Sequence, residues 1–351
     1  MSTPAWRVLP DEWKGLLAER GLRPFRADQI LQCLYRDYIQ DWDLATTLPK
    51  DFRATLKTEF PLVPPTVLDR TDAADGTAKL LLGLTDGNSV ETVVIPAKGR
   101  LTQCVSSQVG CAMGCVFCAS GSAGLVRSLQ AEEIVAQVMM AQRLFATPEN
   151  RRQGSGLCLT NLVVMGMGEP FANYDETLRA LKLLNAGRGP NLGARHITLS
   201  TCGVVPGFAR LAAEGLQFEL SVSLHAPNDE LRRTMMPIAN RYTIAETLAA
   251  CDAYFKKTGR RMSYEYSLVR GSNDSEEMAL ALAKLLKGRN CHVNLIPVNP
   301  VTERGFEASF DAAVLRFQKT LEKNGINATI RKKMGADIDG ACGQLRRRLL
   351  Q

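Results

Sequence analysis

The sequence lacks any run of eighteen apolar residues, and its start, MSTPAWRVLPDEWK, lacks a charged segment followed by an apolar block. The first absence argues against a membrane-spanning helix, and the second argues against a secretory signal. We therefore expect a cytoplasmic protein with no membrane association. In that reducing compartment the ten cysteines are expected to serve metal binding or catalysis rather than a disulfide framework.

Low-complexity segments and blocks of acidic residues are also missing, while the formal net charge is +7. Basic residues recur in close groups at Arg151–Arg152, Lys256–Lys257, Arg260–Arg261, Arg331–Lys333 and Arg346–Arg348. Any one such group is ordinarily a solvated surface. Because these groups have no acidic counterparts, their number favours a polyanionic partner, namely RNA.

The 351 residues divide into stretches of different character. Residues 1–62 carry helical periodicity with start and stop signals, which predict a small helical N-terminal accessory domain. Residues 63–100 contain two β-rich runs joined by Asp86-Gly87-Asn88, a signal for a β-hairpin linking this domain to the next. Apolar strands and amphipathic helices alternate over residues 101–333, and residues 334–351 form a tail outside the repeat.

The alternation predicts an α/β fold whose parallel strands are joined by right-handed helical crossovers. About six strand–helix units, rather than eight, predict a partial (β/α)6 barrel with a small helical N-terminal domain and a mobile C-terminal tail. In such sheets the chemically active residues collect at the carboxyl ends of the strands. We expect a monomer.

Three cysteines, Cys111, Cys115 and Cys118, lie close together in SSQVGCAMGCVFCASG at residues 106–121. This spacing lets one loop bind three corners of an iron–sulfur cluster and leaves one iron open to a small molecule. A structural zinc site needs four ligands, so the alternative is zinc with Cys104 or another cysteine as the fourth. We expect the cluster, because the triplet follows the first strand of a βα series and Phe117 precedes its last cysteine.

Six segments then occur in order: CVSSQVGCAMGCVFCASG, VVMGMGEPFANYDETLRAL, ITLSTCGVVPG, VSLHAPNDELRRTMMPIA, NLIPVNP and GADIDGACGQL. With the helical start FRADQILQCLY, they resemble the radical S-adenosylmethionine RNA methyltransferases of the RlmN/Cfr family, most closely the RlmN branch. The resemblance implies a [4Fe–4S] cluster held by Cys111, Cys115 and Cys118, and S-adenosyl-L-methionine as the second cofactor. It also implies methylation of carbon 2 of adenosine in 23S rRNA, and in tRNA, with an external electron donor such as flavodoxin.

Carbon 2 of adenine and the methyl group of S-adenosylmethionine are both electrophilic, so direct methyl transfer fails. In the family, the methyl group is first placed on a cysteine. The resemblance assigns this S-methylcysteine to Cys342 in GACGQL. It assigns the resolving cysteine, which forms a transient disulfide with Cys342, to Cys104, and a proton acceptor to Glu91 in SVETVVIP. From the pattern alone, both cysteines could be incidental thiols, and Glu91 a polar position in an alternating strand.

The resemblance places the S-adenosylmethionine contacts at predicted strand ends, which a barrel gathers around one mouth. These residues are Gly168, Glu169, Ser200, Ser223, Leu224, His225 and Asn299. The remaining cysteines fall in apolar helix or strand patterns and are expected to serve packing: Cys33, Cys158, Cys202, Cys251 and Cys291. The helical start resembles the family's RNA-binding module, where basic residues could meet phosphates: Arg20, Arg23, Arg26 and Lys50.

Alternatives to carbon 2 methylation stay open. The Cfr branch methylates carbon 8 of the same ribosomal adenosine, and no residue considered above decides between the two positions. A radical enzyme that activates a protein partner would not need Cys342, Cys104 or a basic surface. A zinc-bound, non-enzymatic RNA-binding protein would hold colourless metal and make no 5′-deoxyadenosine.

Overall fold

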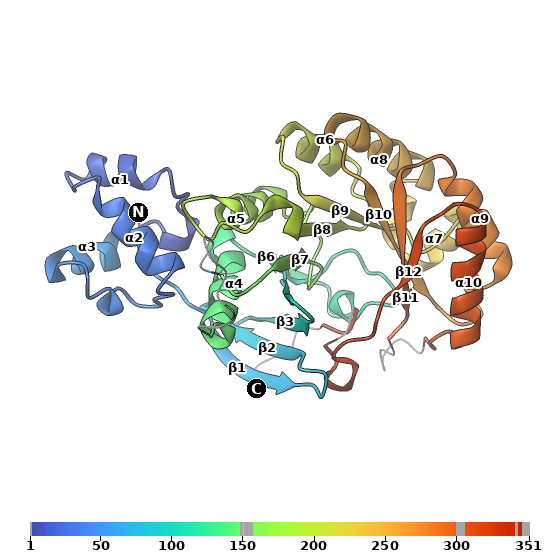
Figure 1. Ribbon diagram of the computed structural model, residues 1–351, viewed down its shortest axis with the longest axis horizontal. Helices are drawn as coiled ribbons and strands as arrows, with labels where there is room; N and C mark the ends of the chain where they lie inside the picture. Colours follow the sequence, from blue (N-terminus) through green and yellow to red (C-terminus); the bar gives the residue numbers. More distant parts are fainter. Residues whose placement is uncertain (1, 148–149, 151–156, 300–305, 341–342, 346–351) are drawn as a thin grey trace.

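A computed structural model describes residues 2–147, 150, 157–299, 306–340 and 343–345 (Figure 1). Its main sheet has ten strands in the order β1-β2-β3-β4-β7-β8-β9-β10-β11-β12. The strands are β1 (Thr66–Asp72), β2 (Ala78–Gly83), β3 (Ser89–Ala97), β4 (Arg100–Cys104), β7 (Asn161–Val164), β8 (Ile197–Thr201), β9 (Glu219–Ser223), β10 (Met262–Leu268), β11 (Cys291–Pro297) and β12 (Ala328–Ile330).

From β4 to β12 every neighbouring pair of strands is parallel. The connections between these strands carry the helices α4 (Ala131–Phe145), α5 (Tyr174–Asn185), α6 (Pro206–Ala213), α7 (Asp229–Met235), α8 (Ile244–Thr258), α9 (Glu276–Leu286) and α10 (Asp311–Lys323). Six strand–helix steps followed by β12 confirm the predicted partial barrel. All these strands therefore end at one edge of the sheet.

Local signals explain where individual helices begin and end, as α8 shows. The Thr243 hydroxyl accepts the Glu246 N–H, and the Glu246 carboxylate accepts the Thr243 N–H, which forms a capping box. The helix stops at Gly259, whose φ of 69° suits glycine. No helix in the described ranges is long and apolar enough to cross a bilayer.

The antiparallel strands β1, β2 and β3 extend the barrel sheet beyond β4. The turn predicted at residues 86–88 does join β2 to β3. The sequence reading missed β1, because its side chains, TVLDRTD, are mostly polar and mostly exposed. An edge strand of this kind is stabilised by backbone pairing and carries little hydrophobic pattern.

The N-terminal helices α1 (Trp13–Glu19), α2 (Arg26–Tyr35) and α3 (Lys50–Glu59) overlap the helical segments read from the sequence. They pack around buried Trp6, Trp13 and Trp42, and the Trp13 ring lies 4.8 Å from that of Phe60. Burial of such large rings supplies much of a small helical domain's stability. Figure 1 shows these helices at one end of the molecule, beside α4 and α5.

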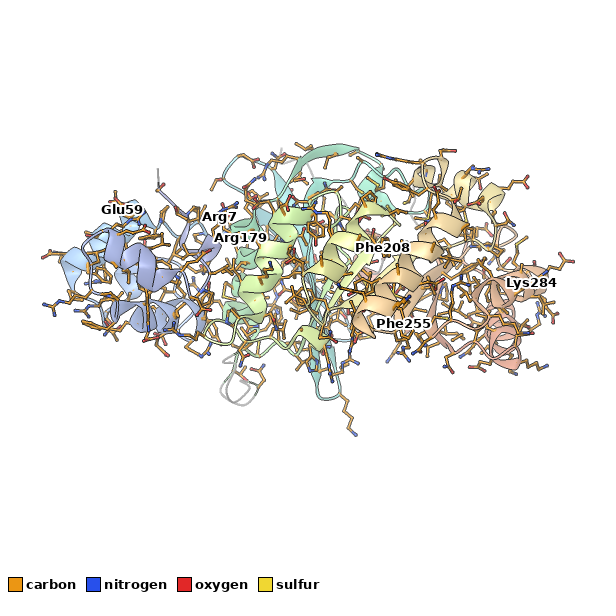
Figure 2. All side chains as sticks on the ribbon, turned by 90° about the horizontal axis from the view of Figure 1, so that it is seen from above. Arg7, Glu59, Arg179, Phe208, Phe255 and Lys284 are labelled. Carbon is orange, nitrogen blue, oxygen red and sulfur yellow. The ribbon has the colours of Figure 1, made fainter. Side chains whose placement is uncertain are left out.

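Ion pairs join the N-terminal helices to the barrel. Arg7 makes a two-bond contact with Glu176 of α5, at 2.5 and 2.7 Å, and a 3.0 Å contact with Glu132 of α4. Arg179 of α5 lies beside Arg7 (Figure 2), donating to the Arg7 carbonyl and to Glu12. The hydrogen bonds from Arg7 lower the pKa of Glu176. This network holds the N-terminal helices in one position against the barrel.

We predict that Glu176→Gln loosens this junction. Because the pair is partly exposed, the free energy of local opening at the junction should fall by about 1 kcal/mol. Amide exchange in residues 5–12 should then be about fivefold faster at neutral pH. A carboxyl with a lowered pKa stabilises the fold above its unfolded pKa, near 4.5, and the effect is lost as the pH falls. The difference between wild type and variant should therefore shrink as the pH falls below that unfolded pKa. Hydrogen–deuterium exchange measures both.

The matched control is Asp175→Asn, the neighbouring carboxylate, whose side chain is 81% exposed and pairs with Arg210 of α6. It should leave exchange in residues 5–12 unchanged. Equal exchange in wild type and Glu176→Gln at neutral pH would contradict the assigned role.

Candidate active site

The cysteine triplet lies on a loop closed at its base by two short strands. β5 (Gln108–Gly110) and β6 (Leu125–Ser128) pair in antiparallel fashion, and the loop between them carries all three cysteines. Gly110 has a φ of 76°, and a Cβ there would lie 2.0 Å from the carbonyl oxygen of Gly124. Only glycine permits this close approach, so the backbone of the loop returns on itself.

A cavity lies between this loop and the carboxyl ends of the parallel strands. The predicted residues that line it are Cys111, Cys115, Cys118, Gly168, Glu169, Ser200, Ser223, His225 and Asn299. Leu224 does not line it, because its side chain is fully buried in the core. The sequence prediction therefore placed nearly all the proposed cofactor residues around one space.

Burial dominates the electrostatics of the Cys111 and Cys115 thiols. It raises the pKa of Cys111 to about 11, and it raises the pKa of Cys115 as well. Thiolates in this setting need positive charge nearby. Iron bound to sulfur supplies such charge, so three thiols lining one cavity fit an iron–sulfur cluster with one iron open to a ligand.

Glu169 is a buried carboxylate held on both oxygens. One oxygen accepts the Phe171 N–H at 2.9 Å, and the other accepts the Cys202 N–H at 2.7 Å. Burial nevertheless raises the pKa of Glu169. The preceding Gly168 has a φ of 104°, and a Cβ there would lie 2.6 Å from the Gln108 side chain. Glycine at 168 thus lets the strand end approach the cysteine loop, and this fixes Glu169 in the cavity.

His225 lines the same cavity as a neutral ring. Its Nδ1 accepts the Ser267 N–H at 2.8 Å, so the proton of the neutral ring lies on Nε2. Burial lowers the pKa of His225 to about 3. Its φ of 57° is rare for a residue with a side chain, and Asn273 holds this conformation by donating to the His225 carbonyl.

Sequence reasoning missed other polar residues around the cavity. Glu265 lines it, accepting from the Ser221 hydroxyl at 2.6 Å and the Asn294 amide at 2.8 Å. The signal available was a carboxylate inside the apolar strand segment SYEYSLV. Arg232, fully buried, donates to the Cys202 carbonyl at 2.8 Å. Cys202 was expected to serve packing; it is buried but also lines the cavity.

A second cavity adjoins the first and shares residues with it, among them Cys118 and Asn299. Cys104, at the end of β4, lines only this second cavity. Its lining also includes the basic residues Arg100, Arg331, Lys332 and Lys333, and no acidic residue within the described ranges. This space is therefore suited to an anionic ligand placed beside the cysteine loop.

The C-terminal segment is anchored at two places. At the turn between β1 and β2, the Gly335 N–H donates to Asp75 at 3.0 Å. At the cysteine loop, the Ala119 N–H donates to the Gly343 carbonyl at 2.7 Å, and Gly340 and Gly343 line the second cavity. Cys342 lies outside the described residues.

Comparisons with known proteins agree along the whole chain. A family model for the "Radical SAM superfamily" matches residues 105–283, and one for the "Ribosomal RNA large subunit methyltransferase N-terminal domain" matches residues 10–61. A probable dual-specificity RNA methyltransferase RlmN of Lachnoclostridium phytofermentans is 47% identical over 338 residues, covering 96% of this chain and 92% of that protein. Another, from Clostridium novyi, is 45% identical over 342 residues, with 97% of each covered.

The crystal structure of a radical SAM methyltransferase from Sphaerobacter thermophilus matches with a TM-score of 0.92 and 46% identity, covering 98% of this chain and 99% of that one. The chain belongs to the RlmN family of radical SAM RNA methyltransferases. Its cofactors are those of the superfamily, a [4Fe–4S] cluster held by three cysteines and S-adenosyl-L-methionine.

We predict that Gly168→Ala destabilises this RlmN-type fold by about 2 kcal/mol or more, because the new Cβ meets Gln108 in a conformation that alanine rarely adopts. Thermal unfolding of the protein without cofactors measures the loss. The control is Gly187→Ala, where nothing lies within 4 Å of the added Cβ. Equal melting temperatures for Gly168→Ala and wild type would refute the packing described for the GMGEP segment.

Proposed function

We propose that this protein methylates carbon 2 of adenosine in 23S rRNA, and in tRNA, through an S-methylcysteine at Cys342. The observation that carries the proposal is the junction of the two cavities. Cys118 lines both of them, Cys104 lines the second, and Gly340 and Gly343, the described residues nearest to Cys342, line the second as well. The described tail residues on either side of Cys342 therefore border both spaces, because Gly343 lines both cavities and Gly340 lines the second.

The first cavity is proposed to hold the cofactors. Cys111, Cys115 and Cys118 would each bind one iron, while Glu169 and the backbone at Gly168 would bind the amino group of S-adenosylmethionine. The other contacts would be Ser200, Ser223, His225 and Asn299, while Leu224 would serve the core. When bound, the cluster supplies the electron that cleaves S-adenosylmethionine and so forms a radical; this radical removes a hydrogen atom from the methyl thioether.

Two further candidates, Glu91 and Cys104, share one face of the sheet. Val93 of β3 pairs with Cys104 of β4, and residues two apart on a strand point to the same side. Glu91, which is 1% exposed, therefore points to the same face of the sheet as Cys104. In the proposed reaction Glu91 would accept a proton from carbon 2 of the radical adduct, and one electron would return to the cluster, when bound, so that the protein–RNA adduct is closed-shell.

Cys104 would then release the product. Its thiolate attacks the sulfur of Cys342, which forms a disulfide and breaks the bond from that sulfur to the transferred carbon. The electron pair of the broken bond remains with the carbon, which takes a proton as the methylated base leaves. Reduction of the disulfide by cellular thiols restores both cysteines.

The RNA would enter through the second cavity, with Arg100, Lys332 and Lys333 meeting phosphates around an adenine turned out of its stack. The N-terminal helices would add contacts. Among their candidates, Arg20 already pairs with Glu59 and packs over Phe60, so Arg20 would serve the fold first. We further propose a cytoplasmic monomer that takes electrons from an external donor such as flavodoxin.

The direct test is an anaerobic assay with purified protein, a chemical reductant, S-adenosylmethionine and 23S rRNA or tRNA, followed by mass spectrometry of the digested nucleosides. We expect 2-methyladenosine from both RNAs. 8-Methyladenosine would instead support Cfr-type methylation, and unmodified RNA together with tightly bound zinc would support the non-enzymatic alternative.

We predict that Cys104→Ala forms the adduct between Cys342 and RNA but cannot release it. A nuclease-sensitive, covalent protein–RNA band should accumulate in denaturing gels, while methylated product falls by about 100-fold or more. Cys342→Ala should give neither band nor product. The control is Cys33→Ala, a buried cysteine of α2, which should behave as wild type. Normal turnover by Cys104→Ala would exclude the resolving role.

We predict that Cys115→Ala loses most of the iron, because a two-cysteine site cannot hold the cubane, whereas Cys202→Ala retains it. Both thiols line the first cavity, so comparing the two variants distinguishes a cysteine that binds iron from one that only lies beside the site. Iron and sulfide analysis of anaerobically purified protein is the measurement. Loss of metal in both variants, with zinc in the wild type, would indicate a four-cysteine zinc site.

A further inference from the structure

We propose that Lys79 of β2 is a positioning residue that keeps Glu91 ionised and joins it to the C-terminal segment leading to Cys342. The inference rests on the function proposed above, and it adds a residue with no assigned role. The Lys79 Nζ lies 3.7 Å from Glu91 Oε1, and the two side chains are only 4% and 1% exposed. A lysine buried to this degree is rare unless its charge is matched.

The strand register places this pair beside Cys104. Lys79 of β2 is directly opposite Val93 of β3, which is directly opposite Cys104 of β4. Paired residues share a face of the sheet, so Lys79, Glu91 and Cys104 point to the same side. The proposed proton acceptor thus has the cation on one neighbouring strand and the proposed resolving thiol on the other.

Lys79 also contacts the tail. Its Nζ donates to the carbonyl oxygen of Asp339 at 3.3 Å, three positions before Cys342 in the sequence. The same tail segment is held nearby by bonds from Gly335 to Asp75 and from Ala74 to Asp337. One ammonium group therefore connects the carboxylate with the backbone that leads to the methyl-carrying cysteine.

The pairing has a chemical consequence. A carboxylate taken out of water without a cation becomes protonated, and a protonated carboxyl group cannot accept another proton. The Lys79 ammonium stabilises the charged form of Glu91, so the base is ready before the adduct forms. Methyl loading of Cys342 requires no base at this position, so the charge of Lys79 acts only on the later step.

The test compares Lys79→Gln, which removes the charge but retains an N–H donor for the Asp339 carbonyl, with Lys79→Arg, which retains the charge. In Lys79→Gln we expect normal methylation of Cys342, turnover slower by about tenfold or more, and accumulation of the covalent RNA adduct. Lys79→Arg should stay within about threefold of wild type. The control is Lys98→Gln, an exposed lysine just after β3, with no expected effect.

A double variant keeps the test decisive if Lys79→Gln perturbs the fold. If Lys79 acts through Glu91, the double variant Lys79→Gln/Glu91→Gln should turn over no more slowly than Glu91→Gln alone. If the two residues act independently, the fold-losses in turnover of the single variants should multiply. Normal turnover in Lys79→Gln, or multiplied defects, would overturn the inference.

Glu91→Gln by itself distinguishes failure of the proton-acceptor role of Glu91 from failure of the positioning role of Lys79. With Glu91→Gln about 100-fold slow and Lys79→Gln normal, only the role of Lys79 fails. Normal turnover in Glu91→Gln would remove the proton-acceptor role of Glu91, and the role of Lys79 with it.

Discussion

Contact between the cysteine loop and the C-terminal segment is the constraint on which the site depends. The Ala119 N–H donates to the Gly343 carbonyl at 2.7 Å, and the Ser120 hydroxyl donates to the Leu345 carbonyl at 2.6 Å. The second bond joins residues 225 positions apart in the sequence, and Ala119 and Ser120 directly follow Cys118. Without them, residues 343–345 would lose these bonds to the cysteine loop, and the tail would be held by the bonds at residues 335–339.

Burial of polar groups is the second feature of the site. Glu169, His225 and Glu265 are almost fully buried around one cavity, and the strand ends supply their hydrogen bonds. Such burial costs stability unless each group is paired. The rigid barrel edge therefore pre-forms the space, while the short loop and tail complete it.

The barrel and most of its cavity residues could be predicted, because strand ends follow from the alternation of apolar strands and amphipathic helices. The exposed edge strand β1 and the short strands β5 and β6 could not, because backbone pairing between distant segments stabilises them. Lys79 escaped prediction for a similar reason. Its proximity to Glu91 depends on cross-strand register, which the hydrophobic pattern of one strand does not reveal. The assignments of Cys104 and Cys342 came from resemblance.

The central claim is that Cys342 carries the methyl group before RNA arrives. Protein produced with S-adenosylmethionine and an intact cluster, purified without RNA and digested, can be tested by peptide mass spectrometry. The account predicts one added methyl group on the peptide containing Cys342, and none on those containing Cys104 or Cys202. An unmodified Cys342 in protein that still methylates RNA on mixing would contradict it.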